Sequence, residues 1–458
     1  MKIIICGAGQ VGWQIARRLS NDTNDVTLVD NNPALVRRAT EVLDVQGVTG
    51  FACHPEVLDA AGARDADMII AATYSDEVNM VTCQVAHSVF NVTRKIARLR
   101  AQSYLDPRYS DLYRREHLPI DVIISPEREV AGAALRRLRA PAAFDIAEFL
   151  DGQGQLMGIA LDEDCPVLNT PLQQLTDLFS TLRAMVVGVR RDKTLFAPEP
   201  EDQLFAGDQI YLFTHSDDVD RSLEVFGKPV LRQERALIIG GGNVGLTVAR
   251  ALEAGPRRMR VRVIEADRAR AEKAADALER TIVLHGDGLD PELLQEAGVA
   301  TADAVLTVSN DDKTNMLAAV RAKTMGCSLS IALINDPSLA PLMEPLNIDA
   351  HIVPRATTVS SILRHVRLGR VRQIYSVGDN EAEVIEAQVL AASPMAGQRI
   401  RDIDFPEGVL VGAVQKGGAL QRPRGSTVLE DGDVVVIFAL AADVPAVERL
   451  VQVSVDYF

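Results

Sequence analysis

Positive charge is in short supply in this sequence: Lys and Arg total 48 against 63 Asp and Glu, which gives a formal net charge of −15 at pH 7. So acidic a body repels phosphate backbones, and we expect no nucleic acid as its main partner. Aromatic residues make up only 4% of the 458 residues, while hydrophobic residues make up 47%. That hydrophobic share excludes wholesale disorder, and the length predicts more than one domain.

Long apolar runs are also missing. The longest stretch without Asp, Glu, Lys or Arg spans Val78–Thr93 and contains the polar Asn79 and His87. A membrane-spanning helix needs roughly 20 mostly apolar residues, so we expect no such helix. The strand-like run Lys2–Ile5 follows Met1 at once, so we also expect no signal peptide.

Cysteine and histidine are too scattered to build a disulfide framework or a metal site. The five cysteines include no Cys-x-x-Cys pair, and the seven histidines include no pair at ligand spacing. An odd number of isolated cysteines is typical of a protein in the reducing cytoplasm. The sequence therefore predicts no metal ligands.

Self-similarity, by contrast, is abundant. Ile3–Gly12 recurs as Ala236–Gly245, and Asn79-Met80 recurs in the same order as Asn315-Met316. Further matches pair Pro55–Leu58 with Pro291–Leu294 and Ile120-Asp121 with Ile348-Asp349. This many ordered matches predict two tandem copies of one unit.

Each copy divides into two parts. The first part alternates short apolar runs with helical patterns, which predicts a Rossmann-like α/β lobe with a parallel sheet. In the second part, Gly207-Asp208 and Gly432-Asp433 each precede an apolar run, which is a hairpin signal and predicts a small α+β lobe. The predicted domains are residues 1–125 and 233–355 for the Rossmann-like lobes and residues 144–227 and 373–453 for the small lobes. In copy one we expect strands at Lys2–Cys6, Val26–Asp30, Val45–Val48, Met68–Ala72, Lys95–Leu99 and Asp121–Ile124.

The glycine-rich loop of copy one has the spacing of a dinucleotide-binding motif. Gly7 allows a tight turn, Gly9 lets a pyrophosphate approach the backbone, and Gly12 permits close packing of helix on sheet. Asp30 ends the next predicted strand, where a carboxylate can accept hydrogen bonds from ribose hydroxyls and would repel a 2′-phosphate. The pattern therefore favours NAD(H) over NADP(H), with a Rossmann lobe that holds no ligand as the alternative.

Copy two repeats the loop as Gly240, Gly242 and Gly245, followed by Glu265 in place of Asp30. It differs at one cation, because Arg98 aligns with Leu333. If Arg98 reaches a phosphate, only site one has that charge-assisted contact, and site two should bind more weakly or prefer another ligand. The alternative for Arg98 is a surface salt bridge.

The segments after the fourth predicted strand of each copy carry polar groups. Thr73–Asp76 and Ser309–Asp312 can line a ligand crevice at the carboxyl ends of the strands or cap the helices that follow. No Tyr is followed four residues later by Lys, so the acid–base pair of short-chain dehydrogenases is absent. We therefore assign no catalytic residue, with an NAD-dependent oxidoreductase as the rival hypothesis.

The tandem order of lobes, with Gly7–Gly12, Asp76–Met80 and Gly241–Gly245, resembles the TrkA family across essentially the whole chain. This resemblance implies a non-enzymatic, cytoplasmic regulatory subunit of a potassium-uptake system, peripheral on the inner face of the cell membrane. It also implies a homo-oligomeric gating ring beneath an integral membrane potassium-translocating subunit, and control by NAD(H) and by ATP or ADP.

The resemblance also carries two sets of site residues onto this sequence. The first site would comprise Gly7, Ala8, Gly9, Gln10, Val11, Gly12, Asp30, Thr73, Tyr74 and Arg98. The second would comprise Gly240, Gly241, Gly242, Asn243, Val244, Gly245, Glu265, Ser309 and Asn310. One departure separates the copies: the Gly-Asp pair common after the third strand is present as Gly286-Asp287, whereas copy one reads Gly50-Phe51.

Overall fold

The computed structural model describes residues 1–20, 24–228, 233–255, 259–366, 371–378 and 381–451. The chain divides into two compact units, and each unit is built from two separate stretches. Unit 1 comprises Met1–Leu135 with Gln233–Val366, and unit 2 comprises Arg136–Arg232 with Arg367–Phe458. Residues 379–380 and 452–453 of the predicted fourth domain lie outside the described residues.

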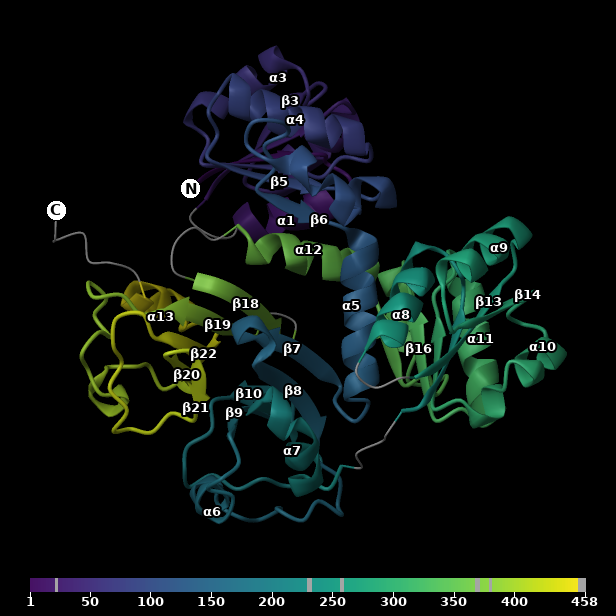
Figure 1. Cartoon of the computed structure of the whole chain (residues 1–458). Coiled ribbons are helices and arrows are strands. Elements are labelled where there is room, and N and C mark those ends of the chain that lie inside the picture. Colours follow the sequence, from purple (N-terminus) through teal and green to yellow (C-terminus); the bar gives the residue numbers. More distant parts are fainter. Residues whose placement is uncertain (21–23, 229–232, 256–258, 367–370, 379–380, 452–458) are drawn as a thin grey trace. The chain divides into compact units, whose positions relative to one another are not determined.

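The first lobe of unit 1 is a six-stranded parallel sheet in the order β3-β2-β1-β4-β5-β6, with helices on both faces (Figure 1). This is the strand order of a Rossmann fold, as predicted. Helices cover both faces of such a sheet, so its central strands are apolar runs: Ile3–Cys6 of β1 and Met68–Ala71 of β4 are all buried. The strands are β1 (Lys2–Cys6), β2 (Asp25–Asp30), β3 (Gln46–Thr49), β4 (Met68–Ala71), β5 (Arg94–Arg98) and β6 (Val122–Ile124). The helices are α1 (Gln10–Ser20), α2 (Pro33–Val42), α3 (Pro55–Ala60), α4 (Asp76–Ser88) and α5 (Pro126–Arg139).

The second lobe of unit 1 repeats this topology, with the strand order β14-β13-β12-β15-β16-β17. The internal duplication is therefore confirmed at the level of topology. Its strands are β12 (Arg235–Ile239), β13 (Arg260–Glu265), β14 (Ile282–His285), β15 (Ala304–Thr307), β16 (Leu329–Leu333) and β17 (Ala350–Ile352). Its helices are α8 (Asn243–Ala254), α9 (Arg268–Ala277), α10 (Pro291–Glu296), α11 (Asp312–Thr324) and α12 (Pro354–Arg364).

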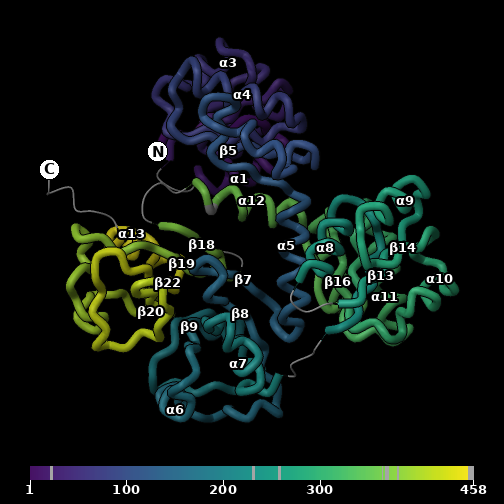
Figure 2. The backbone as a smooth tube through the Cα atoms, viewed as in Figure 1, coloured from purple at the N-terminus to yellow at the C-terminus, as the bar shows by residue number. Residues whose placement is uncertain are grey.

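Helix α12 follows the second sheet but packs on the first lobe. Its buried Val359 and Ile362 join the apolar cluster that contains Ile15 and Leu19 of α1. Figure 2 shows α12 running beside α1, and the two helices are in contact. The hydrophobic core of lobe one is thus completed by chain from copy two.

Unit 2 contains two five-stranded antiparallel sheets, in the orders β10-β9-β11-β8-β7 and β18-β19-β22-β20-β21. The first small lobe has β7 (Asp145–Phe149), β8 (Gly154–Ala160), α6 (Leu172–Leu178), β9 (Ala184–Arg191), β10 (Thr194–Phe196), β11 (Gln209–His215) and α7 (Val219–Val225). The second has β18 (Val371–Val377), β19 (Ala382–Gln388), β20 (Val409–Lys416), β21 (Ala419–Gln421), β22 (Val434–Leu440) and α13 (Val444–Val451).

The hairpin prediction at the Gly-Asp pairs was wrong. Gly207-Asp208 does form a turn, with Gly207 at φ +88°, but the strand after it, β11, lies between β8 and β9 and does not pair with β10. The hairpin in this lobe joins β9 to β10 through Asp192 and Lys193, both at positive φ. A turn signal locates a chain reversal but does not say which strand the next segment will pair with.

The two small lobes share one core. Phe149 and Phe213 of the first sheet belong to the same buried cluster as Phe438 of the second. The contact is close enough that a Cβ added at Gly188 would lie 2.8 Å from the Phe438 ring. Across it, the Glu386 carboxylate accepts a 2.7 Å hydrogen bond from the backbone N–H of Leu150.

No helix within the described residues has the length and apolar content needed to cross a bilayer.

Candidate functional site

The glycine loop between β1 and α1 has the geometry that its sequence predicts. Gly7 lies at φ +108°, a conformation that favours glycine, and a Cβ at Gly12 would lie only 1.7 Å from the Gly7 carbonyl oxygen. A Cβ at Gly9, in contrast, would meet nothing within 4 Å. Gly7 and Gly12 therefore allow the tight conformation of the loop. Gly9 leaves open space just before α1, which starts at Gln10 and Val11.

Asp30 ends β2 beside this loop. Its carboxylate accepts hydrogen bonds from the backbone N–H of Ala8 at 2.6 Å and of Asn32 at 2.8 Å. Among the described residues no cation lies within ion-pair distance of it. Because each carboxylate oxygen has two lone pairs, both oxygens keep capacity to accept from a further donor.

A buried asparagine organises the ends of β4 and β5. The side-chain oxygen of Asn79 accepts hydrogen bonds from the Thr73 backbone N–H at 2.9 Å and the Thr73 hydroxyl at 2.6 Å. The side-chain nitrogen of Asn79 donates to the Arg98 carbonyl at 2.8 Å. Asn79 therefore fixes Thr73 and Arg98 relative to each other. The sequence showed Asn79 only as a repeated residue, and its recurrence at matching places in both copies was the signal for this role.

The sequence left two roles open for this loop, lining a ligand crevice and capping the following helix, and Tyr74 and Ser75 differ in which role they fit. Ser75 caps α4 by accepting from the Val78 backbone N–H at 3.3 Å, so the capping interpretation holds for Ser75. The Tyr74 ring is 85% exposed and lies 5.8 Å from the Arg100 guanidinium. An exposed ring at the carboxyl edge of the sheet offers a stacking surface to a planar ligand.

Arg98 lies half-buried at the carboxyl end of β5. Its Nε is fully buried without a hydrogen-bond partner, and burial lowers the pKa of its guanidinium. Among the described residues no carboxylate lies within ion-pair distance of Arg98, so the structure does not support the surface salt bridge considered above. A buried, unpartnered guanidinium nitrogen is costly unless an anion completes it.

Lobe two reproduces this scaffold. Gly240 lies at φ +112°, a Cβ at Gly245 would lie 1.9 Å from the Gly240 carbonyl oxygen, and one at Gly242 would meet nothing within 4 Å. The loop leads into α8 at Asn243 and Val244. The buried Asn315 accepts from the Ser309 N–H and hydroxyl at 2.9 and 2.8 Å and donates to the Leu333 carbonyl, whereas Asn310 is exposed in the loop.

The acidic residue of lobe two has different partners. Glu265 is only 4% exposed, and its Oε2 accepts from the Gly241 N–H at 2.7 Å. Its Oε1 accepts from the Asp267 N–H at 2.9 Å and from Arg270 at 2.9 and 3.1 Å. The position that corresponds to Arg270 after Asp30 is Leu35. Arg270 was not predicted from the sequence, although a cation in the first turn of the helix that follows Glu265 was visible there.

Family models match the chain in the same alternating order. The TrkA-N domain matches residues 3–126 and 236–354, and the TrkA-C domain matches residues 156–227 and 384–452. The chain is 47% identical to the Trk system potassium uptake protein TrkA of Azorhizobium caulinodans, with 100% of each chain covered. It is 35% identical to the protein of the same name from Halomonas elongata, again with 100% of each covered.

Solved structures show the same fold. The GsuK RCK domain matches with a TM-score of 0.59 at 18% identity, covering 98% of this chain and 94% of that one. The GsuK channel bound to NAD matches with the same TM-score and identity, covering 98% of this chain and 78% of that one. From the family models and the full-length relatives together, we conclude that the chain belongs to the TrkA family.

Proposed function

We propose that this chain is a regulatory subunit of a potassium-uptake system and that lobe one binds NAD(H) or an adenine nucleotide as its input. One observation carries the proposal: within the described residues of lobe one, the open space at Gly9 lies beside Asp30, a carboxylate that has no cationic partner there, while Arg98 has no anionic partner there. A ligand with ribose hydroxyls and phosphates has donors for the first group and charge for the second.

The described residues fit such a ligand. Gly9 leaves room for the backbone to approach a pyrophosphate, and the start of α1 supplies N–H groups and a positive dipole end. The Asp30 oxygens can accept from ribose hydroxyls, and they disfavour a 2′-phosphate, so NAD(H) is favoured over NADP(H). When bound, the ligand supplies phosphate charge and an adenosine group, while Asp30, Arg98 and Tyr74 orient them.

Lobe two is the weaker site in this proposal. Its Glu265 already accepts two bonds from Arg270, and its Leu333 has no charge to offer a phosphate. Each missing charge-assisted hydrogen bond lowers binding by about 1.5–3 kcal/mol. We therefore expect lobe two to bind an adenine nucleotide weakly or to select a different one.

Regulation of transport requires a partner and more than one site. Coupling by one ligand is typically about 1–3 kcal/mol, whereas moving a switch from 1:99 to 99:1 takes about 5.5 kcal/mol. Several occupied sites in a homo-oligomeric ring would supply this difference. The ring would act from the cytoplasmic face on an integral membrane potassium-translocating subunit, and the names of the full-length relatives as potassium uptake proteins support this placement in a transport system.

Calorimetric titration of NADH and ATP into wild type, Asp30→Ala and Glu265→Ala tests the proposal. We expect one tight site per chain, lost in Asp30→Ala and retained in Glu265→Ala. If Asp30→Ala binds NADH and ATP with unchanged affinity, the proposed site in lobe one is wrong.

The rival hypothesis, an NAD-dependent oxidoreductase, is tested with the same protein. Absorbance of NADH is followed in the presence of candidate carbonyl substrates. The sensor hypothesis predicts binding without turnover, and sustained consumption of NADH with release of a reduced product contradicts it.

A further inference from the structure

The first small lobe contains a cavity of about 500 Å³, within the usual range for small-molecule sites. Its walls are mostly apolar and include Leu172, Leu175 and Phe179 near α6, Leu212 of β11 and Phe226 after α7. Leu410 and Arg422, from the second small lobe of the same unit, also line it. An occupant would therefore contact both lobes of unit 2.

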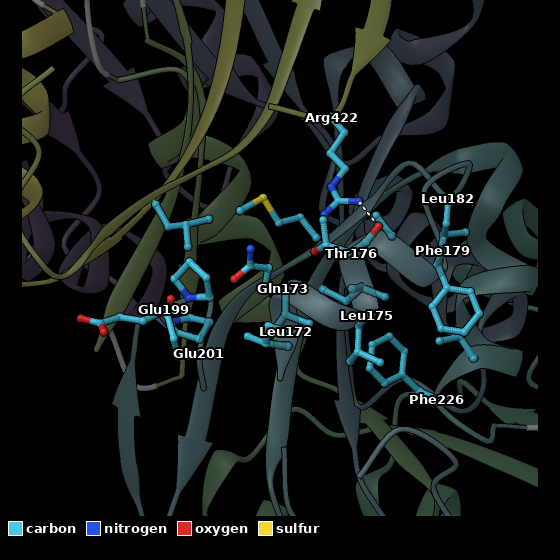
Figure 3. Close-up of a pocket in the computed structure, with 18 residues that line it drawn as sticks. Leu172, Gln173, Leu175, Thr176, Phe179, Leu182, Glu199, Glu201, Phe226 and Arg422 are labelled. Atoms are coloured by element: carbon cyan, nitrogen blue, oxygen red, sulfur yellow. Dashed lines mark hydrogen bonds between the residues drawn. The ribbon is translucent and has the colours of Figure 1, made fainter. Parts of the chain in front are cut away.

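The cation Arg422 lines the cavity beside α6. Figure 3 shows the Arg422 guanidinium close to Thr176, and its Nη1 donates to the Thr176 carbonyl at 3.4 Å. Among the described residues no carboxylate lies within ion-pair distance of Arg422. Burial lowers the pKa of the Arg422 guanidinium most, the nearby Arg424 lowers it further, and the nearby exposed Asp177 of α6 raises it. The guanidinium thus has one long bond to a neutral acceptor and keeps its other donors for an anion.

The two acidic residues of the lining lie elsewhere. Glu199 and Glu201 are exposed and stand apart from Arg422 in Figure 3, beyond Leu172 and Gln173. Within the described residues, no ion pair joins Arg422 to Glu199, to Glu201 or to the nearby Asp177, so its guanidinium donors remain available to an anion.

We propose that this cavity binds an amphipathic anion, namely an acyl chain that ends in a carboxylate, with the carboxylate at Arg422 and the chain against α6. The apolar walls match the chain, and the guanidinium matches a carboxylate in a bidentate geometry. The occupant joins the two small lobes, since α6 belongs to one and Arg422 to the other. All the lining residues belong to unit 2, whereas the glycine loops belong to unit 1.

Calorimetric titration of the full chain with dodecanoate, dodecanol and dodecylamine, all below their aggregation concentrations, tests this site. Dodecanoate should bind at least about tenfold more tightly than dodecanol, because the bond to Arg422 is charge-assisted. Across octanoate, decanoate and dodecanoate, affinity should rise by about fourfold per methylene that enters the apolar cavity. Vesicles containing phosphatidylglycerol form a further arm: binding to vesicles without binding to free dodecanoate would assign the anion to a lipid surface and overturn the proposal.

Two variants and a matched control locate the binding. Arg422→Gln should abolish the preference for dodecanoate over dodecanol while leaving dodecanol binding unchanged. The exposed Arg424→Gln, which removes the same charge outside the lining, should keep that preference. Leu172→Trp should block all three ligands by filling the cavity, with circular dichroism confirming that the variant is folded.

Besides the vesicle result, three outcomes would overturn the site. They are tighter binding of dodecylamine than of dodecanoate, which would point to Glu199 and Glu201; binding that survives both Arg422→Gln and Leu172→Trp; and no binding of any ligand. A parallel NADH titration keeps this result separate from the proposed function, because unit 1 should bind NADH whatever happens in unit 2.

Discussion

The two Rossmann lobes share a scaffold and differ in where they place a cation. Within the described residues of lobe one, Arg98 ends β5 without an anionic partner, and the Asp30 carboxylate accepts hydrogen bonds from backbone N–H groups and from no cation. In lobe two Leu333 replaces Arg98, and Arg270 binds Glu265 directly. Duplicated glycine loops therefore do not imply duplicated ligand sites, because side chains outside the loops decide which charges remain free for a ligand.

The largest effect is expected from the third glycine. Gly12→Ala would place a methyl group 1.7 Å from the Gly7 carbonyl oxygen, so the loop must move. We expect the free energy of unfolding to fall by about 1–3 kcal/mol. We also expect no measurable NADH binding in lobe one. Urea unfolding and calorimetry measure the two quantities.

Gly9→Ala is the matched control, because its methyl group meets no atom within 4 Å. It should leave the unfolding free energy unchanged and weaken only NADH binding. If neither Gly12→Ala nor Gly9→Ala changes the unfolding free energy or NADH binding, the assigned loop geometry is contradicted.

The next largest effect is expected on NADH affinity when the residues at the ends of β5 and β16, Arg98 and Leu333, are exchanged. Arg98→Leu makes lobe one resemble lobe two, and NADH affinity should fall by about 10- to 100-fold, which corresponds to one charge-assisted hydrogen bond. Leu333→Arg should strengthen lobe two, measured in an Asp30→Ala background that silences lobe one. Equal affinity in Arg98→Leu and wild type would show that the buried guanidinium does not contact the ligand.

A smaller change in NADH affinity is expected when Glu265 of lobe two loses its contact with Arg270. Arg270→Leu leaves Glu265 bonded to the N–H groups of Gly241 and Asp267 but releases the remaining capacity of Oε1. In the Asp30→Ala background, NADH affinity should rise by roughly two- to tenfold, the contribution of one ordinary hydrogen bond. An affinity that falls instead would mean that Arg270 itself holds the ligand.

The smallest effect concerns the helix caps. Ser75→Ala removes a 3.3 Å bond to Val78 and should cost about 0.5–1 kcal/mol of unfolding free energy. Asp311→Ala removes 2.7 Å bonds to both the N–H and the hydroxyl of Thr314, so its cost should be larger. Urea unfolding of the two variants side by side decides the order, and the reverse order would contradict the cap geometry.

The strand positions of the first lobe and its Rossmann-like parallel sheet were predicted closely from the sequence. The strand predicted at Lys2–Cys6 has those bounds in the structure, and the one predicted at Val26–Asp30 begins one residue earlier, at Asp25. Such strands are continuous apolar runs because helices cover both faces of the sheet, which makes them visible without knowledge of their neighbours.

Tertiary partners could not be predicted in the same way. The apolar face of α12 is visible in the sequence, but nothing there says that Val359 and Ile362 will pack on lobe one. Asn79 contacts Thr73 and Arg98 only because β4 and β5 end side by side. The turn at Gly207-Asp208 was recognised, whereas its strand pairing depends on the whole small lobe.

The central claim is that occupancy of lobe one controls potassium transport, and reconstituted flux tests it most directly. The membrane partner, identified by co-purification, is placed in liposomes with either wild type or Asp30→Ala, and potassium flux is recorded over a range of NADH concentrations. We predict that flux changes with NADH for wild type and stays constant for Asp30→Ala. The same NADH response in both proteins would contradict the account.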